Sequence, residues 1–144
     1  MAVYYAACAV LLLLYNLIAP PLTGVQLQRG VEYLFGGERI VFSYDPVASS
    51  RISSHLRHAV VAAEDGRFYE HWGVDWEAIR DAVEDNIERG EAHRGGSTIT
   101  QQLVKNLFMT THSSFLRKAF ELPLTFMAEL FLPKERILTL YLNV

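Results

Sequence analysis

The first fifth of the 144-residue chain carries no charged side chain, because the first Asp, Glu, Lys or Arg is Arg29. Within it, residues 3–19 are almost wholly apolar, and Asn16 is their one strongly polar residue. A helix that spans a bilayer needs about 20 predominantly apolar residues, with a range of about 17 to 25. We therefore predict one N-terminal transmembrane helix, an anchor over residues 1–21 that ends at Pro20 and Pro21.

Two other interpretations of this segment stay open. A cleaved signal peptide would begin with a positively charged leader and end in a small-residue cleavage site, and the segment has a poor match to both. A buried core helix is the other interpretation, and it is less common for so uniform an apolar run at a chain end. The anchor is the interpretation that we prefer.

The composition of the whole chain limits its function. It is 51% hydrophobic and 20% charged, which excludes a disordered chain. Its one cysteine, Cys8, excludes an internal disulfide framework and a cysteine-rich zinc site. The net charge of −3 gives no reason to expect a nucleic acid as a partner.

Residues 22–50 are a membrane-proximal linker whose structure is ambiguous. Residues 25–35 fit either one arm of a hairpin at Gly36 and Gly37 or a juxtamembrane helix. Residues 38–44 are the best strand-like segment in the chain. Both alternatives for residues 25–35 are carried forward.

From Ser49 onward the apolar period is helical, so we predict a mainly α domain over residues 51–144. Start and stop signals divide it into five helices. They are a helix ending at Glu64 and Asp65, one from Asp75 to Gly90, one capped by Ser97, one from Ser113 or Ser114 to Phe131 with a kink or break at Pro123, and one opened by Pro133 with Ile137, Leu138 and Tyr141 inward.

Charge is distributed unevenly along this domain. Residues 64–91 hold ten acidic residues and three arginines. Residues 94–120 hold four cationic residues and no acid, and Glu121 follows them. A cationic segment between isolated carboxylates suits an anionic ligand handled by acid–base chemistry. An unevenly charged, solvated surface is the simpler alternative.

Three segments carry chemistry. Glu64 follows four apolar residues at a helix end, so we expect its carboxylate to be partly desolvated, as suits a general base. His71, seven residues on, is expected to be a structural hydrogen-bonding group.

The second segment, residues 95–106, reads GGSTITQQLVKN. Its two glycines allow a close backbone approach to a ligand, and the helix that follows offers free N–H groups to an anion. Its polar face carries Thr98, Gln101, Gln102 and Lys105. The third segment places Arg117 and Lys118 one helical turn before Glu121, which also fits simple intrahelical ion pairs.

The order of these motifs resembles the family 51 glycosyltransferases, the peptidoglycan polymerases. The first motif is Glu64, Asp65, Phe68, His71 and Gly73, the second runs from Gly95 through Gly96 to Asn106, and the third is Arg117, Lys118 and Glu121. A fourth covers residues 134–143 and includes Tyr141 and Asn143. The single anchor is more similar to the monofunctional transglycosylases than to the bifunctional penicillin-binding proteins. The chain ends within the fourth motif, so we expect the glycosyltransferase domain to be incomplete.

The resemblance implies a lysozyme-like α-helical fold and an inverting transfer of the growing, undecaprenyl-linked glycan to the 4-hydroxyl of lipid II. It implies that Glu64 is the general base and Glu121 the second catalytic carboxylate. Substrate or pyrophosphate binding is implied for Asp65, Ser97, Thr98, Gln101, Gln102, Lys105, Arg117 and Lys118. The other motif residues are expected to be structural.

The resemblance also implies a divalent cation, Mg²⁺ or Mn²⁺, as the only cofactor, with unknown ligands. The resemblance implies that the protein is located in the bacterial inner membrane, with the catalytic domain on the periplasmic side. Cell-division or other wall-synthesis proteins are expected as protein partners. The alternatives are a lysozyme-like enzyme that cleaves peptidoglycan and a non-catalytic, membrane-anchored scaffold.

Overall fold

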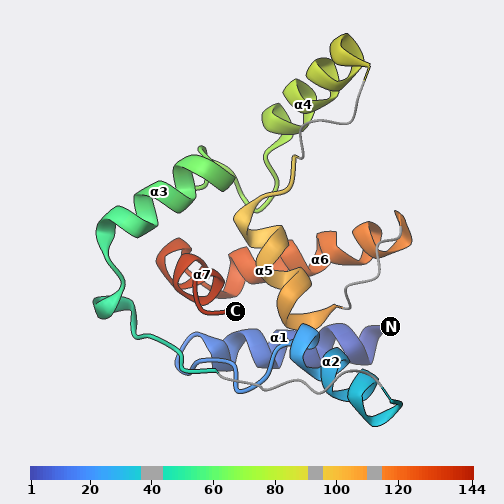
Figure 1. The fold of residues 1–144 in the computed structure, drawn as a ribbon, viewed down its shortest axis with the longest axis vertical. Coiled ribbons are helices and arrows are strands. Elements are labelled where there is room, and N and C mark those ends of the chain that lie inside the picture. Colours follow the sequence, from blue (N-terminus) through green and yellow to red (C-terminus); the bar gives the residue numbers. More distant parts are fainter. Residues whose placement is uncertain (37–43, 91–95, 110–114) are drawn as a thin grey trace.

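The computed structural model describes residues 1–36, 44–90, 96–109 and 115–144, and these residues form helices and turns without a strand. The predicted mainly α class is therefore confirmed for the described part of the chain. The predicted strand at 38–44 lies outside it, except for Tyr44. The helices are α1 (Ala2–Tyr15), α2 (Gly24–Leu34), the short 3₁₀ helix η1 (Ser49–Arg51), α3 (Ser54–Glu64), α4 (Trp76–Arg89), α5 (Ile99–Phe108), α6 (Phe115–Phe131) and α7 (Lys134–Tyr141) (Figure 1).

Helix α5 lies at the centre of the fold and contacts α2, α6 and α7. One of its faces is apolar, and Ile99, Leu103 and Leu107 on that face are buried. The same core receives Leu124 from α6 and Leu138 from α7. Since burial of each large apolar side chain contributes about 1.5 to 3 kcal/mol, this shared core contributes much of the stability of the fold.

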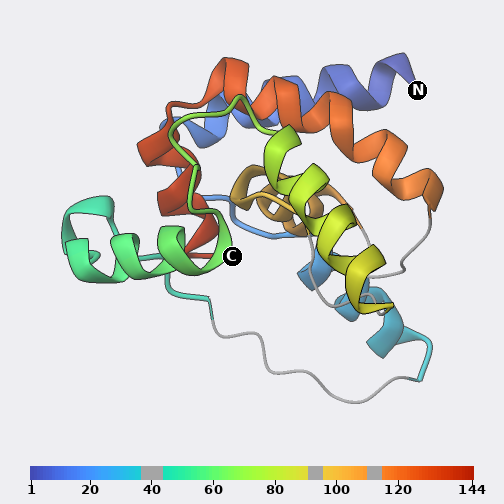
Figure 2. The same cartoon turned by 90° about the horizontal axis from the view of Figure 1, so that it is seen from above.

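Helix α1 lies beside α6, as Figure 2 shows, and buries Cys8, Leu12 and Tyr15 in the common core. The ring of Tyr15 stacks on that of Phe108 with centroids 6.4 Å apart. Across the described ranges, no helix has both the length and the apolar character needed to cross a membrane. The transmembrane helix in the predicted fold class is therefore not supported by this structure.

Residues 25–35 form most of α2, so the helical alternative is confirmed and the hairpin is wrong. The decisive local signal is a capping box, in which Thr23 Oγ1 accepts from Gln26 N–H and Gln26 Oε1 accepts from Thr23 N–H. Gly24 brings α2 against the end of α5, because a Cβ there would lie 2.8 Å from the Met109 carbonyl oxygen.

The predicted helix boundaries mostly agree with the structure. Asp75 caps α4, and Gly90 ends it with a φ of 68°. Helix α5, however, is capped by Thr98 and not by Ser97, because the Thr98 side chain and Gln101 form a second capping box. Helix α6 continues through the exposed Pro123, so the predicted local break is wrong.

Helices α3 and α4 lie at the periphery of the fold (Figure 1). Their apolar stripes are consequently less buried than the sequence period indicates. On α4, Trp76, Val83 and Ile87 are exposed, and on α3 so is Leu56. Helix α7 is the opposite case, because Ile137 and Leu138 are buried as predicted, and Tyr141 is half-buried.

Candidate active site around Glu64

Glu64 is the last residue of α3, and its side chain is exposed. The expected partial desolvation against the preceding valines is therefore wrong, because Val60 and Val61 turn toward the core instead. The carboxylate is held by α5, since Gln102 Nε2 donates to Glu64 Oε2 at 2.9 Å. The structure thus brings together the first carboxylate and the second motif, as the predicted site requires.

Gln102 is itself held by the fourth motif. The hydroxyl of Tyr141, at the end of α7, donates to Gln102 Oε1 at 3.0 Å. Burial and the negative charge of Glu64 raise the pKa of Tyr141, so the hydroxyl keeps its proton at neutral pH. Three helices therefore contribute to one chain of hydrogen bonds that ends on Glu64.

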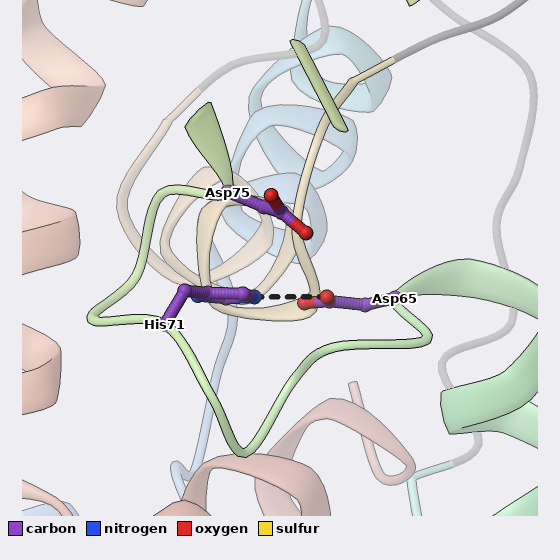
Figure 3. Close-up of side chains that lie close together, drawn as sticks. All are labelled: Asp65, His71 and Asp75. Carbon is purple, nitrogen blue, oxygen red and sulfur yellow. Dashed lines mark hydrogen bonds and ion pairs between the residues drawn. The ribbon is translucent and has the colours of Figure 1, made fainter. Parts of the chain in front are cut away.

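Asp65, the next residue, is buried and joins the loop after α3 to α5. Its Oδ1 lies 2.8 Å from His71 Nε2, and its Oδ2 accepts from the Ile99 backbone N–H at 3.0 Å. Figure 3 shows the His71 ring directed at this carboxylate. His71 thus makes the kind of internal hydrogen bond that a structural role requires, and both oxygens of Asp65 contact groups of the protein itself.

Asp65, His71 and Asp75 place ligand atoms within 4.8 Å of one another, a spacing that could hold a metal ion. Asp75, however, accepts two hydrogen bonds from the Arg67 guanidinium, at 2.9 and 2.8 Å, and one from Ala78 N–H. Burial favours a raised pKa for Asp75, but these bonds outweigh it and lower that pKa. The Arg67 guanidinium already neutralises the Asp75 carboxylate and would repel a metal cation bound to it. This cluster therefore does not fit the expected Mg²⁺ or Mn²⁺.

The polar residues of the second motif have different environments. Thr98 is buried, and its hydroxyl donates to the Gly73 carbonyl at 2.6 Å. Gln101 belongs to the capping box, and Ser97 is exposed. Lys105 and Asn106 are half-buried. Gln102 is the motif residue that meets Glu64.

The glycines of these motifs serve packing. Gly96 approaches α4, because a Cβ there would lie 3.2 Å from the Cα of Ile79. Gly96 thus lies in close contact with Ile79 of α4, whereas Gly95 lies outside the described residues. Gly73 has a φ of 81°, and a Cβ there would lie 2.6 Å from Thr125 Cγ2. Only glycine fits this position without strain.

Two adjoining grooves flank Gly96. One, of about 420 Å³, lies between α4 and α6 and is lined by Gln101, Lys118 and Glu121 together with apolar residues of α4. Glu121 is buried and Lys118 is exposed, whereas the side chain of Arg117 lies outside the described part. The other groove, of about 290 Å³, is lined by Glu64 and Asp65. The two predicted catalytic carboxylates thus face neighbouring grooves that share Gly96.

Sequence reasoning missed a partly buried ion pair between α6 and the start of α7. Glu129 Oε1 lies 2.8 Å from Lys134 Nζ and accepts from the Thr100 hydroxyl at 2.6 Å. The Lys134 ammonium also lies 4.5 Å from the centroid of the buried Phe68 ring. The sequence contained a signal for this buried acid, because Glu129 and Glu121 are the two acidic residues in the otherwise mostly apolar residues 119–133.

The fourth motif secures the segment that precedes α3. Asn143 Nδ2 donates to the carbonyl oxygens of Val47 and Thr139, and Asn143 Oδ1 accepts from Val47 N–H at 2.6 Å. Asn143 therefore joins the end of α7 to the segment around Val47.

Comparison with known proteins decides the family. Residues 39–144 match the family described as Transglycosylase. The chain belongs to this family. Membership in the peptidoglycan glycosyltransferases of family 51 is thereby confirmed, and the match includes all four transglycosylase motifs and both grooves.

Curated relatives of this transglycosylase-family chain agree. A biosynthetic peptidoglycan transglycosylase of Pseudomonas fluorescens is 45% identical over 141 residues, which cover 97% of this chain and 58% of the relative. One from Bordetella pertussis is 58% identical over 105 residues, which cover 70% of this chain and 43% of the relative. One from Janthinobacterium is 53% identical over 95 residues, which cover 66% of this chain and 41% of the relative. The matched segments thus cover between 41% and 58% of the length of these relatives.

Proposed function

We propose that this chain belongs to a peptidoglycan polymerase that transfers the growing, lipid-linked glycan to the 4-hydroxyl of lipid II and releases undecaprenyl diphosphate. The observation that carries the proposal is the hydrogen bond from Gln102 to Glu64, within a chain of the transglycosylase family. Within the described ranges, Gln102 is the one hydrogen-bond donor to this carboxylate. Glu64 Oε1 is thus open to a sugar hydroxyl.

In the proposed reaction, Glu64 takes the proton of the acceptor hydroxyl as its oxygen attacks the anomeric carbon of the donor sugar. The bond from that carbon to the pyrophosphate oxygen breaks, and the configuration inverts. Pyrophosphate leaves as an anion and needs no proton from the enzyme, unlike the leaving group of a glycosidase. The base and the leaving group are therefore expected in adjoining grooves.

The groove between α4 and α6 suits the leaving group. Lys118 supplies a positive charge there, and Lys105 and Arg117 match the same role in the family. Glu121 is the one acid among the described residues that line this groove. A carboxylate together with substrate phosphates is a common setting for Mg²⁺, so Glu121 would hold the divalent cation. When bound, that ion would neutralise charge on the departing pyrophosphate.

The proposal includes a lysozyme-like fold and attachment to the periplasmic side of the inner membrane through residues 1–21. Exposed apolar side chains on α1, among them Val3, Val10 and Leu13, support the attachment. Helix α1 alone rises roughly 21 Å, at about 1.5 Å per residue, against about 30 Å of hydrocarbon, so a spanning anchor would extend beyond Tyr15. Carbonate extraction of membranes tests this, because release of the chain would reject an anchor.

Polymerisation of labelled lipid II, with products resolved by length, tests the reaction. We expect polymer from the unmodified chain and at least about 10²-fold less from Glu64→Gln, since loss of a general base removes about 10² to 10⁴ in rate. Shortened glycans from a preformed polymer would show a hydrolase. A cellular phenotype that is unchanged by Glu64→Gln would show a non-catalytic scaffold.

A further inference from the structure

The side chain of Gln102 lies between two groups that are distant in sequence. Its Oε1 is 3.0 Å from the Tyr141 hydroxyl, and its Nε2 is 2.9 Å from Glu64 Oε2. The three residues lie on α7, α5 and α3, and 38 and 39 positions separate Gln102 from the other two. This arrangement depends on the packing of three helices.

The chemistry of the amide gives the arrangement a direction. A glutamine side chain offers an acceptor oxygen on one side and an NH₂ donor on the other. Because the Tyr141 hydroxyl donates to the oxygen, the NH₂ group faces the Glu64 carboxylate. An amide rotated by 180° would place its oxygen against a carboxylate oxygen, an unfavourable contact between two acceptors.

Glu64 needs such a partner because its surroundings do not restrict it. The side chain is exposed, and an exposed glutamate that makes no directed contact populates several rotamers. Tyr141, in contrast, packs its ring against the hydrophobic core and is half-buried. The hydrogen bonds therefore connect an exposed carboxylate to a side chain that is packed against the core.

We propose that Tyr141 is a positioning residue for glycan transfer, whose hydroxyl fixes the Gln102 amide so that Glu64 Oε1 is held ready for the acceptor hydroxyl. The inference rests on the proposed function, since it assumes that Glu64 is the base. A base must lie within hydrogen-bond reach of the proton that it removes, and small displacements slow such reactions strongly. Loss of the hydroxyl is thus expected to reduce turnover more than substrate binding.

The first test measures the amide and requires no turnover. Tyr141→Phe keeps the ring and removes only the hydroxyl donor. Tyr69→Phe is the matched control, because the Tyr69 hydroxyl donates to Glu135 Oε1, at 3.2 Å, and not to Gln102. We expect the order parameter of the Gln102 side-chain NH₂ to fall to a flexible value, below about 0.6, in Tyr141→Phe alone. An equally ordered amide in Tyr141→Phe would overturn the inference.

The second test uses lipid II polymerisation. We expect kcat to fall about 10-fold to 100-fold in Tyr141→Phe, with KM within about twofold and Tyr69→Phe unchanged. A raised KM with unchanged kcat would overturn the positioning role. If the unmodified chain makes no polymer, the proposed function fails, while the amide measurement still decides whether Tyr141 orders Gln102, so the two failures are distinguishable.

Discussion

The carboxylate of Asp65 accepts a hydrogen bond of 3.0 Å from the backbone N–H of Ile99, the first residue of α5. Its other oxygen lies 2.8 Å from His71 Nε2. Asp65 is adjacent to Glu64, and Ile99 lies one helical turn before Gln102. This contact therefore sets the distance between the candidate base and the amide that binds it.

Asp65→Ala is expected to destabilise the fold by about 2 to 3 kcal/mol, because it leaves the buried Ile99 N–H without its acceptor. Asp65→Asn keeps one acceptor oxygen and should have a smaller effect. Urea unfolding followed by circular dichroism measures both. Equal stability of Asp65→Ala and the unmodified chain would show that Asp65 does not secure α5.

Gly73→Ala is expected to destabilise the fold by about 1 to 3 kcal/mol. It combines a φ of 81° with a Cβ only 2.6 Å from Thr125 Cγ2 and 3.0 Å from Glu129 Cγ. Gly66→Ala is the matched control, since that glycine has no positive φ and no atom within 4 Å of its added Cβ. We expect the control to stay within about 0.5 kcal/mol in thermal unfolding. Similar losses in both variants would contradict this explanation.

Lys134→Met should destabilise the fold by about 3 to 5 kcal/mol, because it leaves the buried Glu129 carboxylate without its cation. Glu129→Gln should also destabilise it. The double variant should lose less than the sum of the two single losses, since neither charge is then left unpaired. A double-mutant cycle in urea tests the coupling, and strictly additive losses would rule it out.

The lowered pKa of Asp75 predicts a pH dependence of stability. A carboxyl group with a lowered pKa stabilises the folded state above its unfolded pKa of about 3.9, and the stabilisation is lost as the pH falls through the folded value. Asp75→Asn should therefore lose about 1 to 2 kcal/mol at pH 7 and progressively less below about pH 4.

Asp81→Asn is the control for this pH series. Its contact with Arg80 is exposed and long, at 3.9 Å, so we expect a change within about 0.5 kcal/mol at every pH. Unfolding free energies between pH 3 and 7 measure both variants. A loss in Asp75→Asn that does not change with pH would assign its effect to hydrogen bonding alone.

The sequence by itself determined most of the helices, the cap of α4 and, through its motifs, the family. The helices and caps depend on residues close in sequence, such as Asp75 at the start of α4, and on apolar residues at successive turns, such as Ile99, Leu103 and Leu107. The start of α2 is likewise fixed by a capping box between Thr23 and Gln26. Both residues are close in sequence, so this start could also have been predicted from the sequence. Local chemistry is sufficient for such features.

Only the tertiary structure decided which groups meet. The contacts of Glu64 with Gln102, and of Gln102 with Tyr141, join residues that are 38 and 39 positions apart. The close approach of Gly96 to Ile79, and the exposure of the α4 stripe, also depend on where whole helices pack. Helical period fixes which side chains share a face, but it does not fix the angle and distance at which two helices cross. The site around Glu64 is built from those crossings.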